Sequence, residues 1–229
     1  MAELGLFDAI YTARALRRLK LDPVPDELIT KVLNAAIRAP SGGNAQNWIF
    51  LVVRDREQRH RLGAVYRKAS DEVAEIYAAR GRPAHLSEAQ YQRLMDGGKY
   101  LWEHMSEAPV ILVPCVRARD MPPREALPAP VAARYEAHLA YQERIRGASI
   151  YPAVQNILLA CRALGLGTAI TTNHILYEDD VRAILSLPQD VFTFAMMPVG
   201  FPVDKYGPLS RRPVSEVTFA DRWGNTWPR

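Results

Sequence analysis

The stretch "RAPSGGNAQNWIFLVV", residues 38–53, places a polar loop directly before an apolar run. The loop holds Pro, Ser, Gly, Asn and Gln, and the apolar run begins at Trp48. A chain reversal needs only about two or three residues of this kind. The surplus of main-chain and amide hydrogen-bonding groups therefore indicates a loop that does more than turn the chain.

A helix and a strand are expected on either side of this loop. Residues 22–39 begin with helix start signals at Pro25 and Asp26 and then repeat apolar side chains at helical intervals. Residues 48–53 and 108–116 are continuous apolar runs, which predicts central strands covered on both faces.

Long helices are predicted between and after these strands. Residues 55–81 and 87–106 read as amphipathic helices, and residues 147–172 contain the most apolar helix, which ends at Gly165 or Gly167 and leads into a short strand. The proline-rich segment 118–131 predicts a loop, followed by a helix through Tyr135 and Tyr141. We expect the whole excursion, 118–147, to be a lid near the substrate.

The last third of the chain predicts a helix at 177–188, a buried strand at 191–202 and an extended tail. The tail carries Trp223 and Trp227, which predicts packing against a second subunit. With no internal repeat, low-complexity tract or linker, residues 1–229 are expected to form a single domain.

Composition predicts a soluble, cytoplasmic globular protein. The chain has 229 residues, 48% of them hydrophobic, and shows neither a membrane-spanning apolar run nor an export signal at its start. Its net charge of +4 is spread among acidic residues, so no nucleic-acid partner and no membrane partner is expected. Cys115 and Cys161 are predicted to be small buried hydrophobes, consistent with a reducing compartment.

Motifs for metal or nucleophilic chemistry do not occur in the sequence. The five histidines lack paired-ligand spacing, so we predict no metal site. There is no GxSxG, CxxC or P-loop motif, and "LGLGT" at 164–168 ends a helix, whereas a dinucleotide-binding loop must begin one. The difficult chemistry is therefore expected to belong to a bound organic cofactor, and we predict no catalytic side chain.

Two arginine clusters are candidates for holding such a cofactor. Arg14 and Arg17 or Arg18 would share one face if their segment is helical, so that two guanidinium groups could meet a phosphate. Arg211 and Arg212 lie in the extended tail. Either cluster alone is equally well explained as solvated basic surface.

These motifs, taken in order, resemble the nitroreductase family of FMN-dependent oxidoreductases. "RALRRLKLDPVPDELITKVLNAAIRAPSGGNAQNWIFLVV" is similar to the family's N-terminal signature. "ASIYPAVQNILLACRALGLGTAITT" resembles its central helix, and "MPVGFPVDKYGPLSRRPVSEV" resembles its closing strand and arginine-bearing tail. The resemblance leaves out the helices between residues 55 and 107 and the excursion at 118–147.

The resemblance implies an α+β fold with a central, mostly antiparallel β-sheet flanked by helices, in a domain-swapped homodimer with FMN at the subunit interface. It implies phosphate or ring-edge contacts by Arg14, Arg17, Arg211 and Arg212. Pro40, Ser41, Gly42 and Asn44 would reach the flavin from the partner subunit, and Thr171, Thr172 and Asn173 would lie near flavin N5. This would explain the polar loop, because the flavin edge needs hydrogen-bond donors and glycines allow close approach.

The chain also departs from the family pattern. Ala13 and Ala15 flank Arg14 where the family often has Arg and Ser, and Asn47 replaces the proline of the usual QPW. These differences affect individual contacts, since Asn47 keeps a main-chain donor that proline lacks.

The implied activity is ping-pong turnover, in which NAD(P)H passes a hydride to flavin N5 and a small acceptor such as a nitroaromatic, quinone or enone then collects it. The choice between NADH and NADPH stays open. Other hypotheses also stay open: a reductive dehalogenase or flavin-fragmenting enzyme on the same scaffold, a non-catalytic flavin-binding or storage protein, and a structural α/β interaction module.

Overall fold

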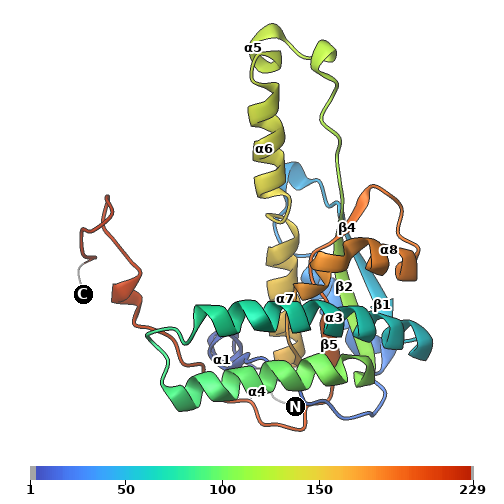
Figure 1. Ribbon diagram of the computed structural model, residues 1–229, viewed down its shortest axis with the longest axis vertical. Helices are drawn as coiled ribbons and strands as arrows, with labels where there is room; N and C mark the ends of the chain where they lie inside the picture. The colour runs from blue at the N-terminus through green and yellow to red at the C-terminus, as the bar shows by residue number, and fades with distance from the viewer. Residues whose placement is uncertain (1–3, 228–229) are drawn as a thin grey trace.

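The computed structural model describes residues 4–227 and shows a twisted antiparallel sheet between two layers of helices (Figure 1). The α-helices are α1 (Leu6–Thr12), α2 (Asp26–Ala36), α3 (Arg56–Arg80), α4 (Glu88–His104), α5 (Ala129–Ala132), α6 (Tyr135–Ile145), α7 (Ile150–Ala163) and α8 (Glu178–Leu185). The strands are β1 (Trp48–Val53), β2 (Val110–Arg117), β3 (Gly167–Thr168), β4 (Val191–Thr193) and β5 (Met197–Gly200). Short 3₁₀ turns are η1 (Gly42–Asn44), η2 (Met105–Glu107), η3 (Arg124–Ala126), η4 (Asn173–Tyr177) and η5 (Val214–Glu216).

The sheet has the order β1-β2-β5-β3, with β4 also paired to β2, and every pairing is antiparallel. The predicted α+β class with a mostly antiparallel sheet is therefore confirmed. Strand β2 is central, as its sequence predicted, and all but its last residue are buried. Strand β1 lies at an edge and is mostly only half-buried, so the prediction that it is covered on both faces is wrong for this chain.

Alternate side chains of β2 enter two separate hydrophobic cores. Leu112 and Val116 pack with residues of α2 and α7, whereas Ile111 and Val113 pack with residues of α3, α4 and α8. This alternation follows from strand geometry, in which successive side chains point to opposite faces. A continuous apolar run is therefore what a strand with helices on both faces requires.

The predicted strand at 191–202 is divided into β4 and β5 by a β-bulge. Three residues, 194–196, face only Val113 and Pro114, because Cys115 pairs with Thr193 and Leu112 with Met197. The Pro114 carbonyl accepts from the Phe194 N–H at 2.9 Å, but a proline has no N–H to donate in return. The partner strand's proline thus accounts for the break.

The cysteine and helix-end predictions agree with the structure. Cys115 and Cys161 are free and buried, and burial raises the pKa of each thiol to about 12. Helix α7 ends just before Gly165, whose φ of +76° is the left-handed conformation that favours glycine at a helix C-terminus. Among the described residues, no helix is long and apolar enough to span a membrane.

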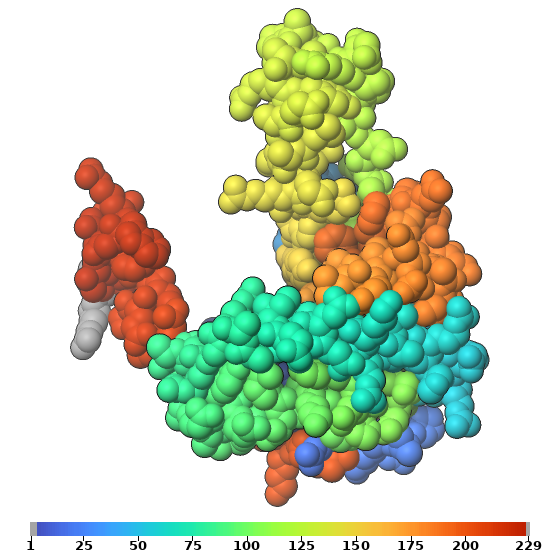
Figure 2. All heavy atoms as spheres, in the orientation of Figure 1, coloured from blue at the N-terminus to red at the C-terminus, as the bar shows by residue number. Residues whose placement is uncertain are grey.

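Two segments project from this body. The excursion carrying η3, α5 and α6 rises from the end of β2 and returns into α7, and the segment after β5 runs along the body and then away from it (Figures 1 and 2). Trp223 and Trp227 on the tail are 89% and 55% exposed. Both indole side chains therefore lie outside the two hydrophobic cores.

Candidate active site

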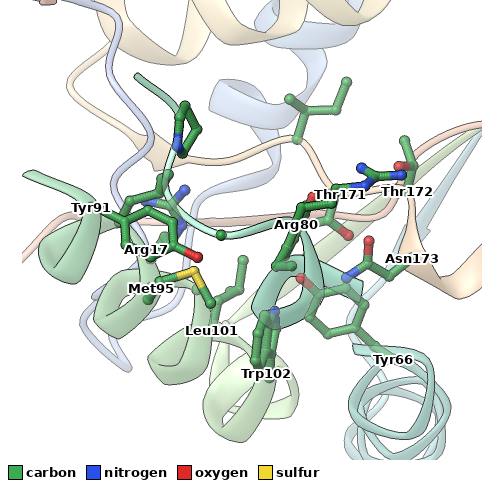
Figure 3. Close-up of a pocket in the computed structure, with 16 residues that line it drawn as sticks. Arg17, Tyr66, Arg80, Tyr91, Met95, Leu101, Trp102, Thr171, Thr172 and Asn173 are labelled. Atoms are coloured by element: carbon green, nitrogen blue, oxygen red, sulfur yellow. The ribbon is translucent and has the colours of Figure 1, made fainter. Parts of the chain in front are cut away.

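A cavity of about 440 Å³ lies between α3, α4 and the segment that follows β3 (Figure 3). It is lined by Arg17, Tyr66, Tyr77, Arg80, Gly81, Pro83, Tyr91, Leu94, Met95, Gly98, Leu101, Trp102, Ile170, Thr171, Thr172 and Asn173. Its volume is within the range of small-molecule sites, roughly 300–1,000 Å³. Four of the predicted site residues, Arg17, Thr171, Thr172 and Asn173, are therefore brought together in one cavity.

Thr171 and Asn173 are held in the cavity wall by bonds to other elements. The Thr171 main chain pairs with Met196, in the bulge between β4 and β5. The Asn173 side-chain amide donates to Ser70 Oγ of α3 at 3.0 Å. The wall is thus fixed on one side by the sheet and on the other by α3.

A buried polar cluster lies beside this wall. Burial raises the pKa of the Tyr66 hydroxyl, while the neighbouring side chains of Thr171 and Ser70, the charge of Arg17 and the Trp102 indole act in the opposite direction. Thr171 Oγ1 is buried and makes no hydrogen bond of good geometry with any described residue, although it lies close enough to the Tyr66 hydroxyl to lower the pKa of that group. Because Thr171 lines the cavity, a ligand bound there could offer this hydroxyl a better hydrogen-bond partner.

Arg17 reaches the cavity from an extended segment. The segment of Arg14, Arg17 and Arg18 is not helical, so the shared face that helical spacing would give does not form. Helix α1 ends at Thr12, and the Leu16 N–H instead donates to the Thr168 carbonyl at 3.1 Å. The guanidinium of Arg17 is half-buried beside α4, and burial lowers its pKa. Arg14 and Arg17 consequently line two different hollows.

The second hollow, of about 240 Å³, contains three arginines. Arg14 and Arg211, both predicted, lie there with Arg162 of α7, and Ile170 lines this hollow as well as the larger cavity. Two buried hydroxyls in this lining, Thr168 Oγ1 and Tyr206 Oη, have no hydrogen-bond partner among the described residues. Three guanidinium groups and two orphaned hydroxyls form a donor set suited to a phosphate.

Arg162 was missed by sequence reasoning. Its guanidinium stacks over Tyr206, 4.0 Å from the ring centroid, and Nε donates to Thr12 Oγ1 at 2.8 Å. A signal was available, since Arg162 is the one charged side chain in the apolar run from Ile150 to Ala163. Burial raises the pKa of Tyr206 to about 12, against the effect of the Arg162 charge.

The polar loop lies apart from both hollows, beside the start of α7 (Figure 1). Its predicted residues are Pro40, Ser41, Gly42 and Asn44, and the Gly42 N–H donates to Ser149 Oγ at 3.1 Å. Ser41 Oγ accepts from the Gln46 N–H at 3.1 Å, and Gly43 has a φ of +58°. Within one chain, no residue of this loop lines the hollow of Arg14 or the cavity of Thr171.

Arg212 and the excursion also lie outside the larger cavity. Arg212 is exposed on the tail next to Arg211. The excursion at 118–147, predicted to be the lid, projects away, and α3 and α4 cover the cavity instead (Figures 1 and 3). The sequence predicted only that these two helices are amphipathic. It therefore did not identify Tyr66, Trp102 or the other residues that cover the cavity.

The histidines form no cluster with other metal-ligating side chains. In residues 4–227, no group of three or more His, Cys, Asp and Glu side chains could hold a metal ion. His174 is fully buried, and its Nε2 lies 3.0 Å from Thr193 Oγ1.

Comparison with known proteins identifies the family to which this chain belongs. The model of the nitroreductase family matches residues 10–201. The chain therefore belongs to the nitroreductase family, and it is an oxidoreductase, as the sequence resemblance predicted.

Three named proteins illustrate what this chain is similar to. An NADH dehydrogenase from Thermus thermophilus is 31% identical over 226 residues, covering 94% of this chain and 97% of the relative. The structure of a candidate nitroreductase in complex with FMN, from Desulfovibrio desulfuricans, superposes with a TM-score of 0.62 at 25% identity, covering 97% of this chain and 99% of that one. Iodotyrosine deiodinase 1 from Rattus norvegicus is 26% identical over 203 residues, covering 88% of this chain and 64% of the relative.

Proposed function

We propose that the protein is an FMN-dependent NAD(P)H oxidoreductase that reduces a small organic acceptor. The observation that carries this proposal is that two neighbouring hollows, one rich in arginine and one lined by aromatic rings, share Ile170 in their linings. A flavin mononucleotide has the same two parts, a phosphate and a planar ring system. The FMN complex of the related candidate nitroreductase supports the same choice of cofactor.

The residues present fit such a cofactor. Arg14, Arg162 and Arg211 would hold the phosphate, and the orphaned hydroxyls of Thr168 and Tyr206 would supply further hydrogen bonds there. Thr171, Thr172 and Asn173 would contact the ring system, where Thr171 Oγ1 would gain the partner that it lacks. Arg212 would add charge near the phosphate.

Bound FMN would supply hydride acceptance at N5 from NAD(P)H and subsequent transfer to the acceptor, in ping-pong order. The residues of this chain would position both partners over the ring and exclude water. Arg17 would place a positive charge at the ring edge, where negative charge increases on reduction. No side chain is required to act as a general acid or base.

The proposed functional unit is a homodimer, each chain a single FMN-binding domain. The supporting observation is the position of the loop Pro40–Asn44, which carries surplus donors but lies apart from the arginines of its own chain. A second subunit could bring its loop to this site. The exposed Trp223 and Trp227, together with exposed Phe7 on α1, offer apolar surface for such an interface.

A reductive dehalogenase is the second candidate, favoured by the similarity to iodotyrosine deiodinase 1. It would use the same flavin site with a halogenated aromatic acceptor. The flavin-fragmenting and storage hypotheses stay open as further alternatives. The cytoplasmic location stays a prediction.

An anaerobic absorbance spectrum, recorded before and after addition of NADPH or NADH, tests the proposal. Flavin bands that bleach with either nucleotide would support the reductase, and the faster nucleotide would identify the donor. Bands that persist would favour dehalogenation with another reductant, or storage. No flavin bands after incubation with FMN would overturn the proposed cofactor.

A further inference from the structure

We propose that the larger cavity selects aromatic acceptors that carry an anionic group, and that Arg80 is the specificity-determining residue that binds this anion. This inference rests on the proposed function, because it concerns the acceptor that would be reduced in the same cavity. It goes further because it specifies the charge of the acceptor and names the residue that binds the charged group.

The cavity lining combines aromatic rings with positive charge. Four aromatic side chains, Tyr66, Tyr77, Tyr91 and Trp102, form much of the wall, and the lining residues within the described chain include two arginines and no Asp or Glu. Aromatic walls favour a planar ring as ligand. A cavity with cations and no carboxylate favours a negative charge on that ring.

The two arginines have different surroundings. Arg17 is half-buried, its charge acts on Tyr66, and it is the arginine assigned to the ring edge in the proposed FMN site. Arg80 is the last residue of α3 and is exposed, so it lies where a ligand would enter. The charge of Arg17 is therefore assigned to the cofactor, which leaves Arg80 for the acceptor.

Arg80 forms no ion pair with any described residue, in contrast to a nearby arginine. Arg82, two positions further along the chain, pairs with Glu88, with Nε 3.4 Å from Oε2. The other carboxylate pairs in the described chain involve Arg54, His104, Arg117 and Arg146. The guanidinium of Arg80 thus keeps its donors available for a ligand.

Arg80 is the last residue of α3 before the turn that leads into α4. Gly81 adopts a φ of +69°, and its N–H donates to the Tyr77 carbonyl at 3.1 Å, which ends the helix. The chain then reverses into α4, which is held by a capping box between Ser87 and Gln90. Helix α4 returns alongside α3 and places Tyr91, Met95 and Trp102 around the same hollow as Arg80 (Figure 3).

This arrangement predicts an order of preference among ring-matched acceptors. A carboxylate would gain charge-assisted hydrogen bonds from the guanidinium, in addition to the ring contacts that a neutral analogue also makes. An ammonium group on the same ring would be repelled by Arg80 and Arg17. The preference should weaken as ionic strength rises, because Arg80 is exposed.

The test uses 4-nitrobenzoate, 4-nitrobenzyl alcohol and 4-nitrobenzylamine with the FMN-loaded full chain. Calorimetric titration of the oxidised protein gives the dissociation constant of each compound without turnover. Re-oxidation of the dithionite-reduced protein by each compound gives its rate. We expect the anion to bind about tenfold more tightly than the alcohol, the value of one charge-assisted contact, and the amine to bind more weakly than both.

Variants assign this preference to Arg80. Arg80→Gln should bring the anion and the alcohol to within about twofold of each other, and Arg80→Lys should restore part of the difference, since lysine keeps the charge but not the planar fork. Arg93→Gln is the matched control, because Arg93 is an exposed arginine of α4. An anion preference that survives in Arg80→Gln, or is lost equally in Arg93→Gln, would overturn the inference.

Failure of this inference can be distinguished from failure of the proposed function. Reduced protein that transfers electrons to all three compounds without regard to charge would refute the anion preference and leave the reductase proposal standing. Protein that binds the anion preferentially through Arg80, but whose flavin neither NADH nor NADPH reduces, would refute the proposed electron donor and support the anion site.

Discussion

Thr171 and Met196 exchange two main-chain hydrogen bonds across the site. The Met196 N–H donates to the Thr171 carbonyl at 2.9 Å, and the Thr171 N–H donates to the Met196 carbonyl at 3.3 Å. Met196 is free to make this pair because it lies in the bulge opposite Pro114, between β4 and β5. A proline on the central strand thus contributes to holding a threonine in the wall of the cavity.

Replacing Thr171 by Val should have opposite effects on the empty and the flavin-loaded protein. Valine keeps the shape and the main-chain bonds but removes a buried hydroxyl that lacks a partner. We expect the free energy of unfolding of FMN-free protein to rise by about 1–2 kcal/mol, and FMN affinity to fall. Urea unfolding and fluorescence titration with FMN measure the two effects.

Thr172→Val is the control for this prediction, because Thr172 lines the same cavity but is exposed. Its free energy of unfolding should change by less than about 0.5 kcal/mol. A stability loss in Thr171→Val would mean that its hydroxyl is already satisfied in the protein without FMN.

Arg211→Ala should weaken FMN binding more than Arg212→Ala does. Both arginines are exposed, but Arg211 lines the arginine-rich hollow with Arg14 and Arg162, whereas Arg212 is not part of that lining. Loss of one charge-assisted contact to a phosphate costs about 1.5–3 kcal/mol, so the dissociation constant should rise at least about tenfold. Equal, small effects in the two variants would remove Arg211 from the phosphate site.

Ser41→Tyr should reduce FMN occupancy without unfolding the chain. In the proposed dimer the loop of the partner subunit meets the flavin, and a tyrosine there would fill the space that the ring requires. Ser41 is half-buried in its own chain and accepts one hydrogen bond from Gln46. Ser41→Ala is the control, since it loses the same hydrogen bond and adds no bulk.

Flavin absorbance per chain and sedimentation velocity measure this outcome. We expect Ser41→Ala to keep both the flavin and the dimer, and Ser41→Tyr to lose flavin. Full occupancy in Ser41→Tyr would show that the polar loop lies away from the cofactor in the assembled protein as well.

The sequence predicted the helices and strands that are determined by residues close to one another in the chain. Helix α2 and strand β2 follow directly from apolar spacing, and the end of α7 at Gly165 follows from one residue with a positive φ. Arg17 and Thr171, both named from the resemblance, line one cavity, but no local pattern places them together. Helix α2, strand β2 and the end of α7 are thus encoded by residues that are close together in the chain.

The remaining features depend on contacts between distant segments. The segment carrying Arg14 and Arg17 has helical spacing, but it is extended because Leu16 bonds to Thr168. The break between β4 and β5 depends on Pro114 of another strand, which the sequence of residues 191–202 does not contain. Tyr66 becomes a wall residue only because α3 packs beside Thr171.

Acid should destabilise the protein through His174, which is buried beside Thr193. Burial lowers the pKa of this imidazole from 6.5 to about 4. The unfolded chain therefore takes up a proton as the pH falls below about 6.5, whereas the folded chain stays neutral until about pH 4, so folded stability decreases across this window. The full difference corresponds to about 3 kcal/mol.

His174→Gln should remove this component, so that its free energy of unfolding falls less between pH 7 and pH 4 than that of the wild type. Urea unfolding at several pH values measures the difference, and the carboxylates that titrate in the same window are common to both proteins. His60→Gln, at an exposed position of α3, is the control and should keep the wild-type slope. Parallel curves for wild type and His174→Gln would mean that the buried imidazole already carries its proton in the folded state, in which case its unpartnered Nδ1 must find an acceptor that the described residues do not provide.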